Sequence, residues 1–473
     1  FRNAQKAFNM WSKWEPTERT TDQLLKMLDF DFFEVLDSVT IARSRKHIQN
    51  YYDVTDIGTF PARNKPISLR PKLTDRPGAI NYKEVFELLS KLQLTIYTPT
   101  IYIHASKLHK YLDEKESENF RKGRELGIQR LMSINLLKRM ESSVHSFLLT
   151  VRRIYDYLYD TSQAIEQFMM DGTGDLDEMR DLSAVADDFD YDDQNTDFFS
   201  VGKKVKIDLR DMDYISWKRD IDEDIENLQL LILMVEDITP EYDFKLNELI
   251  RVIREKVAAP INEGNRKVLI FTAFSDTAEY LFDNISGMAR DELGLHTALV
   301  TGSVDGKTTI PKFKADMNHV LSCFSPMSKD RDVLYPNDKT EIDILIATDC
   351  ISEGQNLQDC DFCINYDIHW NPVRIIQRFG RIDRIGSRNA VIQLVNFWPD
   401  LDLDEYINLK SRVETRMRIS VMTSTGDDDL INQEEKGDLE YRRSQLKKLQ
   451  EEVVDLEDMT SGVSIMDLGL NEF

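Results

Sequence analysis

The strongest constraint on the fold is a series of short apolar segments between residues 266 and 398, most of them separated by helical patterns. The segments are 268–271, 297–300, 342–347, 362–366 and 392–397, all rich in aliphatic, β-branched or aromatic residues. Runs of this length and composition predict strands. Strands that alternate with helices predict an α/β fold, in which a mostly parallel sheet is covered by helices on both faces. Ligands of such sheets collect at the carboxyl ends of the strands.

Three arginines follow the fourth apolar segment, in the stretch Q-R-F-G-R-I-D-R-I-G at 377–386. Arg378, Arg381 and Arg384 recur at every third residue, so on a helix they lie close together on one side. One interpretation is a surface stripe paired with local carboxylates such as Asp383. The other is an anion site, and a transferring phosphoryl group is an anion that arginines commonly neutralise. The spacing alone does not choose between the two.

Three segments resemble motifs IV, V and VI of the Swi/Snf-type helicase-like ATPases, in the same order. They are K-V-L-I-F-T-A-F at 267–274, A-T-D-C-I-S-E-G-Q-N-L at 347–357, and W-N-P at 370–372 running into the arginine stretch. The resemblance is strongest to the bacterial RapA-like branch. A weaker match, I-A-R-S-R-K at 41–46, resembles the basic segment that follows the first motor lobe. The resemblance implies that residues 261–405 form the second RecA-like lobe, the helicase C-terminal domain, of an ATP-dependent motor.

The resemblance also assigns a nucleotide-binding set. Arg381 and Arg384 match the paired motif VI arginines and are the expected catalytic residues, both contacting the γ-phosphate of ATP. Gly354 is expected beside the nucleotide phosphates, and Gln377 at the start of the arginine helix, where it holds the motif in register. Arg378 is expected to pair with a carboxylate of the opposite lobe. Mg²⁺ would be held by the first lobe, because no phosphate loop followed by an acidic box occurs upstream.

A second set is expected to contact nucleic acid. Thr348 follows the segment 342–347, and its hydroxyl and N–H suit a phosphate of a nucleic-acid strand. The alternative is a hydroxyl that stabilises the turn. By resemblance, Thr272 and Gly302 also contact the nucleic-acid backbone, and double-stranded DNA is the expected substrate. Asp349 is expected to fix the motif V loop by accepting N–H bonds.

One stretch imitates a phosphate loop. In G-S-V-D-G-K-T-T at 302–309, three residues separate the glycines, whereas a Walker A loop has four. Pro311 would also interrupt the helix that must follow such a loop. We therefore expect no Walker A site here.

The rest of the chain divides into three regions. Residues 1–105 are expected to hold the tail of the first lobe and a connector, residues 106–260 a helical insertion with an acidic, solvated loop at 171–198, and residues 406–473 a helical brace. Two apolar stripes at helical spacing predict buried faces in the insertion. They are Leu137, Met140, Val144, Phe147, Val151 and Leu158, and Trp217, Ile221, Ile225, Leu228, Ile232 and Val235.

Composition narrows the remaining classes. A formal net charge of −24 argues against a protein that coats nucleic acid with its whole surface, although a local basic groove is compatible with it. The four cysteines provide no disulfide framework and predict buried thiols in a reducing compartment, and Cys360-x-x-Cys363 lacks a second ligand pair, so no metal site is expected. No apolar run is long enough for a bilayer and no leader opens the chain, so we expect a cytoplasmic location without membrane contact.

Together these features predict the C-terminal part of an ATP-dependent nucleic-acid translocase or remodeller. Without the first lobe, these residues are expected to be inactive as an ATPase. One alternative is a strand-separating helicase that acts on DNA or RNA. Another is a non-catalytic regulatory module that binds a polymerase, which the acidic composition favours. RNA polymerase is therefore a candidate protein partner, and the sequence does not indicate an oligomeric state.

Overall fold

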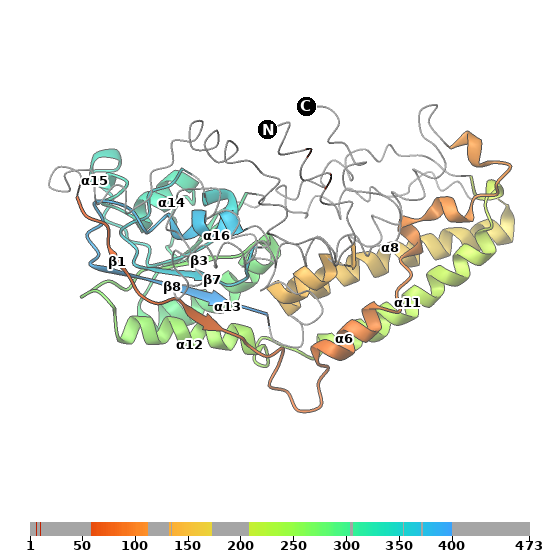
Figure 1. Cartoon of the computed structure of the whole chain (residues 1–473), viewed down its shortest axis with the longest axis horizontal. Helices are drawn as coiled ribbons and strands as arrows, with labels where there is room; N and C mark the ends of the chain where they lie inside the picture. Colours follow the sequence, from red (N-terminus) through yellow and green to blue (C-terminus); the bar gives the residue numbers. More distant parts are fainter. Residues whose placement is uncertain are drawn as a thin grey trace.

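The computed structural model describes residues 58–111, 132–133, 135–172, 208–302, 306–352, 354–369 and 372–399, together with Lys6 and Met10. A sheet with its covering helices lies at one end, and two long helices, α8 and α11, extend toward the other (Figure 1). Four predicted features lie outside the described residues: the basic segment 41–46, almost all of the acidic loop 171–198, Trp370 of motif VI and the brace 406–473.

The sheet confirms the predicted α/β fold. Its order is β1-β8-β7-β3-β6-β4-β5, with β2 also pairing with β8. All pairs are parallel except β4 with β5. The strands are β1 (Ala62–Arg63), β2 (Ile67–Leu69), β3 (Val268–Phe271), β4 (Thr297–Val300), β5 (Lys307–Thr308), β6 (Ile344–Ala347), β7 (Phe362–Asn365) and β8 (Val391–Phe397).

Helices cover both faces of this sheet because the residues of each strand alternate between two apolar cores. Val268 and Ile270 of β3 pack on one side with α12 (Phe244–Ala258) and α13 (Ser275–Leu293). Leu269 and Phe271 pack on the other side with α14 (Met317–Phe324) and the end of α16 (Pro372–Phe379). The short helices α15 (Arg331–Leu334) and η5 (Asp349–Ile351) lie in connections beside the sheet.

The region that precedes α12 is helical and has its own core. It contains α6 (Tyr82–Leu89), α8 (Val144–Asp171) and α11 (Tyr214–Glu236), with the 3-10 turns η1 (Thr95–Tyr97), η2 (Pro99–Tyr102), η3 (Leu108–Lys110) and η4 (Leu209–Asp211). Both predicted apolar stripes pack in this core, with only Ile225 and Ile232 partly exposed. The first stripe crosses a helix break, because residues 135–142 are helical and Ser143 then caps α8 by accepting from the Ser146 N–H at 3.1 Å.

Three strands at the edges of the sheet, β1, β2 and β5, were not predicted. Strands β1 and β2 come from the region expected to be a connector, yet both pair with β8. Each is too short to show an alternating pattern in the sequence. In the described part of the chain, no helix combines the length and the apolar character that a membrane span requires.

Candidate functional site

The carboxyl ends of four adjacent strands form one edge that collects the three residues predicted to contact nucleic acid. Strands β4, β6, β3 and β7 are neighbours and run parallel. Gly302, Thr348, Thr272 and Asp367 follow these strands in that order within two residues of their ends. The sheet therefore brings motifs IV and V to a common edge, as expected for a parallel sheet.

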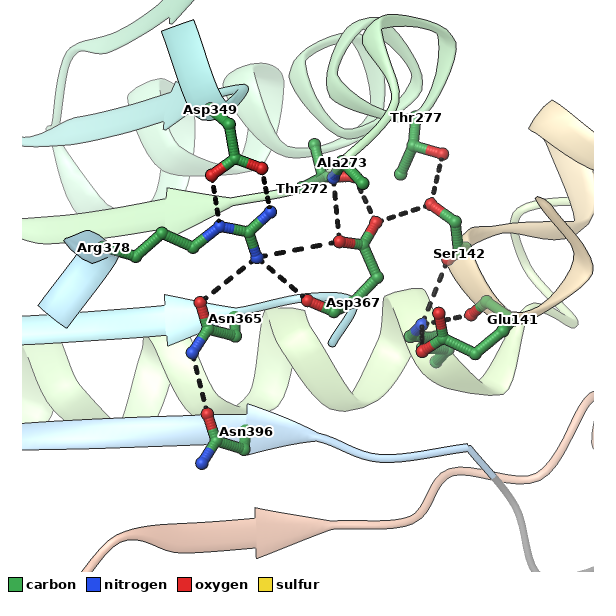
Figure 2. A network of polar contacts seen from close by, with 11 residues as sticks. Glu141, Ser142, Thr272, Ala273, Thr277, Asp349, Asn365, Asp367, Arg378 and Asn396 are labelled. Atoms are coloured by element: carbon green, nitrogen blue, oxygen red, sulfur yellow. Dashed lines mark hydrogen bonds and ion pairs between the residues drawn. The ribbon is translucent and has the colours of Figure 1, made fainter. Parts of the chain in front are cut away.

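Arg378 lies at the centre of a buried polar network on this edge (Figure 2). Its Nε and Nη2 donate to the two carboxylate oxygens of Asp349 at 2.7 and 2.6 Å. Its Nη1 donates to the Asp367 carbonyl at 3.1 Å and to Asn365 Oδ1 at 3.3 Å. Burial alone would lower the pKa of Arg378, but the charge of Asp349 raises it above the ordinary value.

These contacts correct two expectations. Arg378 pairs with a carboxylate of its own lobe, whereas the sequence interpretation placed its partner in the opposite lobe. Among the described residues, the Asp349 carboxylate fixes the motif V loop through this guanidinium, and no backbone N–H donates to it. Because the pair is bidentate, it ties the end of α16 to the segment that follows β6.

Asp367 joins motif IV to the helical region. Its carboxylate accepts from Thr272 Oγ1 at 2.5 Å, from the Ala273 N–H at 2.8 Å and from Ser142 Oγ at 2.6 Å. Ser142 Oγ also lies 2.8 Å from Thr277 Oγ1. Thr272 is fully buried and its hydroxyl is engaged in this network. A nucleic-acid contact by Thr272 stays a prediction, and it would require this hydroxyl to be released or shared.

Arg381 and Arg384 lie beyond the end of the arginine helix. Helix α16 ends at Phe379, so the expectation of one helix carrying all three arginines is wrong. Gly380 and the turns after it redirect the chain, and Arg381 Nε and Arg384 Nε donate to carbonyls four residues earlier at 3.0 and 3.1 Å. Gln377 lies near the C-terminal end of α16, not at its start.

Neutral oxygens hold the other ends of these guanidinium groups. Arg381 Nη1 donates to the carbonyl of Gln355 at 3.0 Å, and Arg384 Nη1 donates to the side-chain oxygen of Asn356. Asp383, the carboxylate proposed as a local partner, instead pairs with Arg63 of β1. Arg384 has no ion pair within the described residues. The local-carboxylate interpretation therefore holds for Arg378, which Asp349 neutralises, whereas an anion site at Arg384 stays a prediction.

Gly354 and Gln377, the other two residues expected to bind the nucleotide, lie next to these arginines. Gly354 has a φ of +69°, a conformation that glycine adopts without strain, and a Cβ placed there would meet no atom within 4 Å. The carbonyl of Gln377 accepts from Arg381, and its Oε1 accepts from Arg374 Nη1 at 3.3 Å. Both positions are compatible with the predicted set, whose role in nucleotide binding stays a prediction.

Thr348, Gly302 and Cys350 lie together on the adjacent part of the edge. The Thr348 N–H donates to the Val300 carbonyl at 3.2 Å, and its hydroxyl lies 3.5 Å from Cys350 Sγ. A Cβ on Gly302 would lie 3.6 Å from Cys350 Cβ. Cys350 is exposed, which corrects the expectation that all four thiols are buried. Thr348 is buried and its N–H is engaged by Val300, so a phosphate contact by its hydroxyl stays a prediction that requires the side chain to become exposed.

The stretch that imitates a phosphate loop forms a strand edge. Lys307 belongs to β5, which pairs antiparallel with β4, and its Nζ donates to Glu279 Oε2 at 2.7 Å. No helix follows β5 directly, since α14 begins at Met317. A Walker A loop requires a helix immediately after its lysine, so this geometry agrees with the prediction that the stretch is not one.

One cluster within the described residues has metal-ligand character. His319, Cys323 and Asp338 bring their ligand atoms within 4.8 Å of one another. However, His319 Nε2 contacts Asp338 Oδ2 directly at 2.7 Å. Two ligands on one zinc ion, each about 2.0 to 2.2 Å from it, are normally farther apart than this. The cluster is therefore explained by a His–Asp hydrogen bond.

Several site residues have little signal in the sequence. Asp367 follows a strand, and ligands collect at strand ends, so its position could have suggested a site residue, but it belongs to none of the three motifs. Ser142 comes from the helical region, more than a hundred residues away. Lys329 lies between α14 and α15, and its Nζ donates to the side-chain oxygen of Gln355, whose carbonyl holds Arg381. Only the fold brings these groups to the arginines.

Comparisons with known proteins match the part of the chain that carries this edge. The helicase conserved C-terminal domain matches residues 245–386. The uncharacterized ATP-dependent helicase YqhH of Bacillus subtilis is 53% identical over 51 residues, which cover 11% of this chain and 9% of YqhH. The RNA polymerase-associated protein RapA of Pectobacterium atrosepticum is 32% identical over 74 residues, 15% of this chain and 8% of RapA. The chain thus aligns with less than a tenth of the length of each of these two relatives.

A solved structure, the C-terminal part of the Fun30 ATPase domain, covers 84% of this chain and 99% of its own length, with 14% identity and a TM-score of 0.30. The RapA-like branch has support from 74 residues only. The broader relationship has support from the domain match and from the helicase relative. Residues 245–386 therefore carry a helicase conserved C-terminal domain, and the similarities support a relationship with the helicase-like ATPases.

Proposed function

We propose that this chain supplies the second motor lobe of an ATP-dependent nucleic-acid translocase or remodeller of the Swi/Snf type. The observation that carries the proposal is the contrast between Arg378 and Arg384. Arg378 is neutralised by Asp349, whereas Arg384 is held by neutral oxygens and has no ion pair in the described part of the chain. A cation held in place without a counter-charge is suited to charge that develops on a transferring phosphoryl group.

ATP is the proposed cofactor, and the bond broken in the proposed reaction is the one that attaches its γ-phosphoryl group. Arg381 and Arg384 would bind that group, Gly354 would let the backbone approach it, and Gln377 would orient Arg381 through its carbonyl. Residues that hold Mg²⁺ are proposed to lie in the first lobe. On this proposal, these 473 residues without a first lobe have no measurable ATPase activity.

Double-stranded DNA is the proposed substrate. Thr348 and Gly302 follow β6 and β4 at the same strand-end edge, and a hydroxyl and an exposed glycine both suit a backbone phosphate. Thr272 is proposed to act there through its link with Asp367. The name of RapA describes that protein as associated with RNA polymerase, and such a partner is proposed here only as a candidate. The cytoplasm is the proposed location.

The test compares two arginines of the same segment in the full-length protein. Arg384→Ala should lower DNA-stimulated ATP hydrolysis by roughly a thousandfold or more, the range of an arginine finger. Arg388→Ala, at an exposed position, should stay within about twofold of the wild type. Equal rates for the two variants would reject the motor and favour a non-catalytic docking module. Displacement of a paired strand by the wild type would favour a strand-separating helicase.

A further inference from the structure

Lys329 is presented by an anchored loop between α14 and α15. The carboxylate of Asp359 accepts from the N–H groups of Met327 at 2.7 Å and Ser328 at 3.1 Å, and from the hydroxyl of Ser328. The N–H of Lys329 itself donates to the Ser325 carbonyl at 3.0 Å. These contacts fix the backbone that carries Lys329, so the position of its side chain is set by the fold.

The side chain of Lys329 converges with both arginines on one short segment. Lys329 Nζ donates to Gln355 Oε1, and Arg381 Nη1 donates to the carbonyl of the same residue at 3.0 Å. Arg384 Nη1 donates to Asn356, the next residue. Three cationic groups therefore gather around Gln355 and Asn356. Within the described residues, the partners that these groups contact in this segment are uncharged oxygens.

No carboxylate of the described residues balances the charge of Lys329. Within the described residues, its only polar side-chain contact is with Gln355. Burial lowers the pKa of Lys329, and the charges of Arg384 and Arg381 lower it further. Like charges at short range destabilise the folded state unless an anion joins them. Among the described residues, no carboxylate pairs with Lys329 or Arg384, so these two groups bring together positive charge without a counter-charge.

A neighbouring lysine shows that the chain supplies carboxylates to cations in this connection. Lys339, ten residues further along, is 70% exposed and pairs with Asp332 at 3.1 Å. Arg331 lies 3.5 Å from the same carboxylate. Lys329 is less exposed than Lys339 but has no such partner in the part of the chain that the structure describes. Lys339 has the contacts of an ordinary solvated surface lysine, and Lys329 does not.

We propose that Lys329 is a third ligand of the terminal phosphate of a nucleoside triphosphate, beside Arg381 and Arg384. The inference rests on the proposed function, because the arginines define where the phosphate lies. An ammonium group contributes a compact charge that complements the planar guanidinium groups. Lys329 then acts as a binding residue of the same site, contributed by a segment outside the three motifs.

The test measures nucleotide affinity of the full-length protein, with the control Lys339→Ala. Lys329→Gln keeps an N–H donor for Gln355 but removes the charge, and Lys329→Ala removes both. Each variant should bind ATP about tenfold more weakly, as expected for one lost charge-assisted contact, and ADP within about twofold of the wild type. Lys339→Ala should leave both affinities unchanged. Lys329→Arg, which keeps the charge, should restore most of the ATP affinity.

Three outcomes would overturn the inference. The first is ATP affinity of Lys329→Gln equal to that of Lys339→Ala. The second is an equal loss for ATP and ADP, because a ligand of the terminal phosphate distinguishes the two. The third is the same loss in Gln355→Ala with Lys329 intact, which would assign Lys329 a purely structural role. Arg384→Ala separates the two proposals. If Arg384→Ala loses ATPase activity while Lys329→Gln binds ATP as tightly as the wild type, only the role of Lys329 is rejected.

Discussion

The guanidinium of Arg378 and the carboxylate of Asp349 form a two-point contact, with Nε 2.7 Å from Oδ1 and Nη2 2.6 Å from Oδ2. The pair connects α16 to the segment that follows β6, two elements that both carry predicted site residues. Because Arg378 is fully buried, its charge depends on Asp349 for compensation. The first arginine of the stretch thus stabilises the lobe, and the ligand role of Arg381 and Arg384 is the proposal that the predictions below test.

Replacing Asp349 should therefore destabilise the fold strongly. Asp349→Asn leaves a buried guanidinium without its counter-charge, so the free energy of unfolding should fall by about 3 to 5 kcal/mol. Urea denaturation measures this change. Asp332→Asn, at a carboxylate that is 69% exposed, should change it by less than about 0.5 kcal/mol. Similar values for both variants would show that the pair is not structural.

Ser142 should couple the helical region to the lobe. Its hydroxyl is buried, donates to Asp367 at 2.6 Å and lies 2.8 Å from the Thr277 hydroxyl. Ser142→Ala leaves both partners short of a hydrogen bond, so we expect a loss of about 1 to 3 kcal/mol in unfolding free energy. Ser90→Ala is the matched control, since that exposed hydroxyl donates only to Phe86 in its own helix. A loss no larger than the control's would exclude the coupling.

Glu141 should make stability depend on pH. Burial raises its pKa from the ordinary 4.5 to about 8, although the charge of Lys245 opposes the shift. A raised pKa means that the folded state holds a proton that the unfolded state has released. The contribution of this carboxyl group to the free energy of unfolding is therefore fully present below about pH 4.5 and is lost as the pH rises through about 8.

Glu141→Gln should remove this part of the pH dependence. Unfolding free energies measured between pH 5 and pH 9 should decline less steeply for the variant than for the wild type. Glu226→Gln, at an exposed position on α11, should retain the wild-type slope. Parallel curves for the wild type and Glu141→Gln would mean that Glu141 does not carry the effect.

Two glycines of the phosphate-loop imitation should respond differently to alanine. A Cβ on Gly306 would lie 2.5 Å from the Ala315 carbonyl oxygen, so the hairpin of β4 and β5 must shift, at a cost of about 1 to 3 kcal/mol. A Cβ on Gly302 meets only Cys350 Cβ at 3.6 Å, which is ordinary contact, and stability should be unchanged.

Gly302→Ala then reports on nucleic acid without a folding defect. If the exposed backbone of Gly302 lies against a DNA phosphate, the added methyl group should weaken double-stranded DNA binding in fluorescence anisotropy by about tenfold. Unchanged affinity in a variant of normal stability would remove Gly302 from the proposed DNA-binding set.

The sequence predicted the central strands because their apolar runs are long enough to be recognised, and β3 and β4 have the expected bounds. The edge strands β1 and β2 have two and three residues, too few for a pattern. The arginine spacing predicted one helix, but Gly380 and the following turns end it, so only Arg378 lies on α16.

The site was predictable in part. Motif resemblance named Arg381 and Arg384, whose neutral oxygen partners could not be read from spacing. Lys329 and Ser142 reach the edge only through tertiary packing, and single lysines and serines carry no local signal. Pairing of Arg378 with Asp349 joins residues 29 apart in the sequence, and either one alone has several equally reasonable partners.

Aluminium fluoride bound with ADP mimics the transferring phosphoryl group. The affinity of the protein for this complex, compared with its affinity for ADP alone, decides whether Arg381 and Arg384 stabilise that group. In the full-length protein with Mg²⁺ and DNA, the wild type should bind the fluoride complex far more tightly, because transition-state analogues gain roughly 10² or more in affinity. Arg381→Ala and Arg384→Ala should lose most of this preference, while Arg388→Ala should keep it. An unchanged preference in both single variants and in the double variant would contradict the assignment of these arginines to phosphoryl transfer.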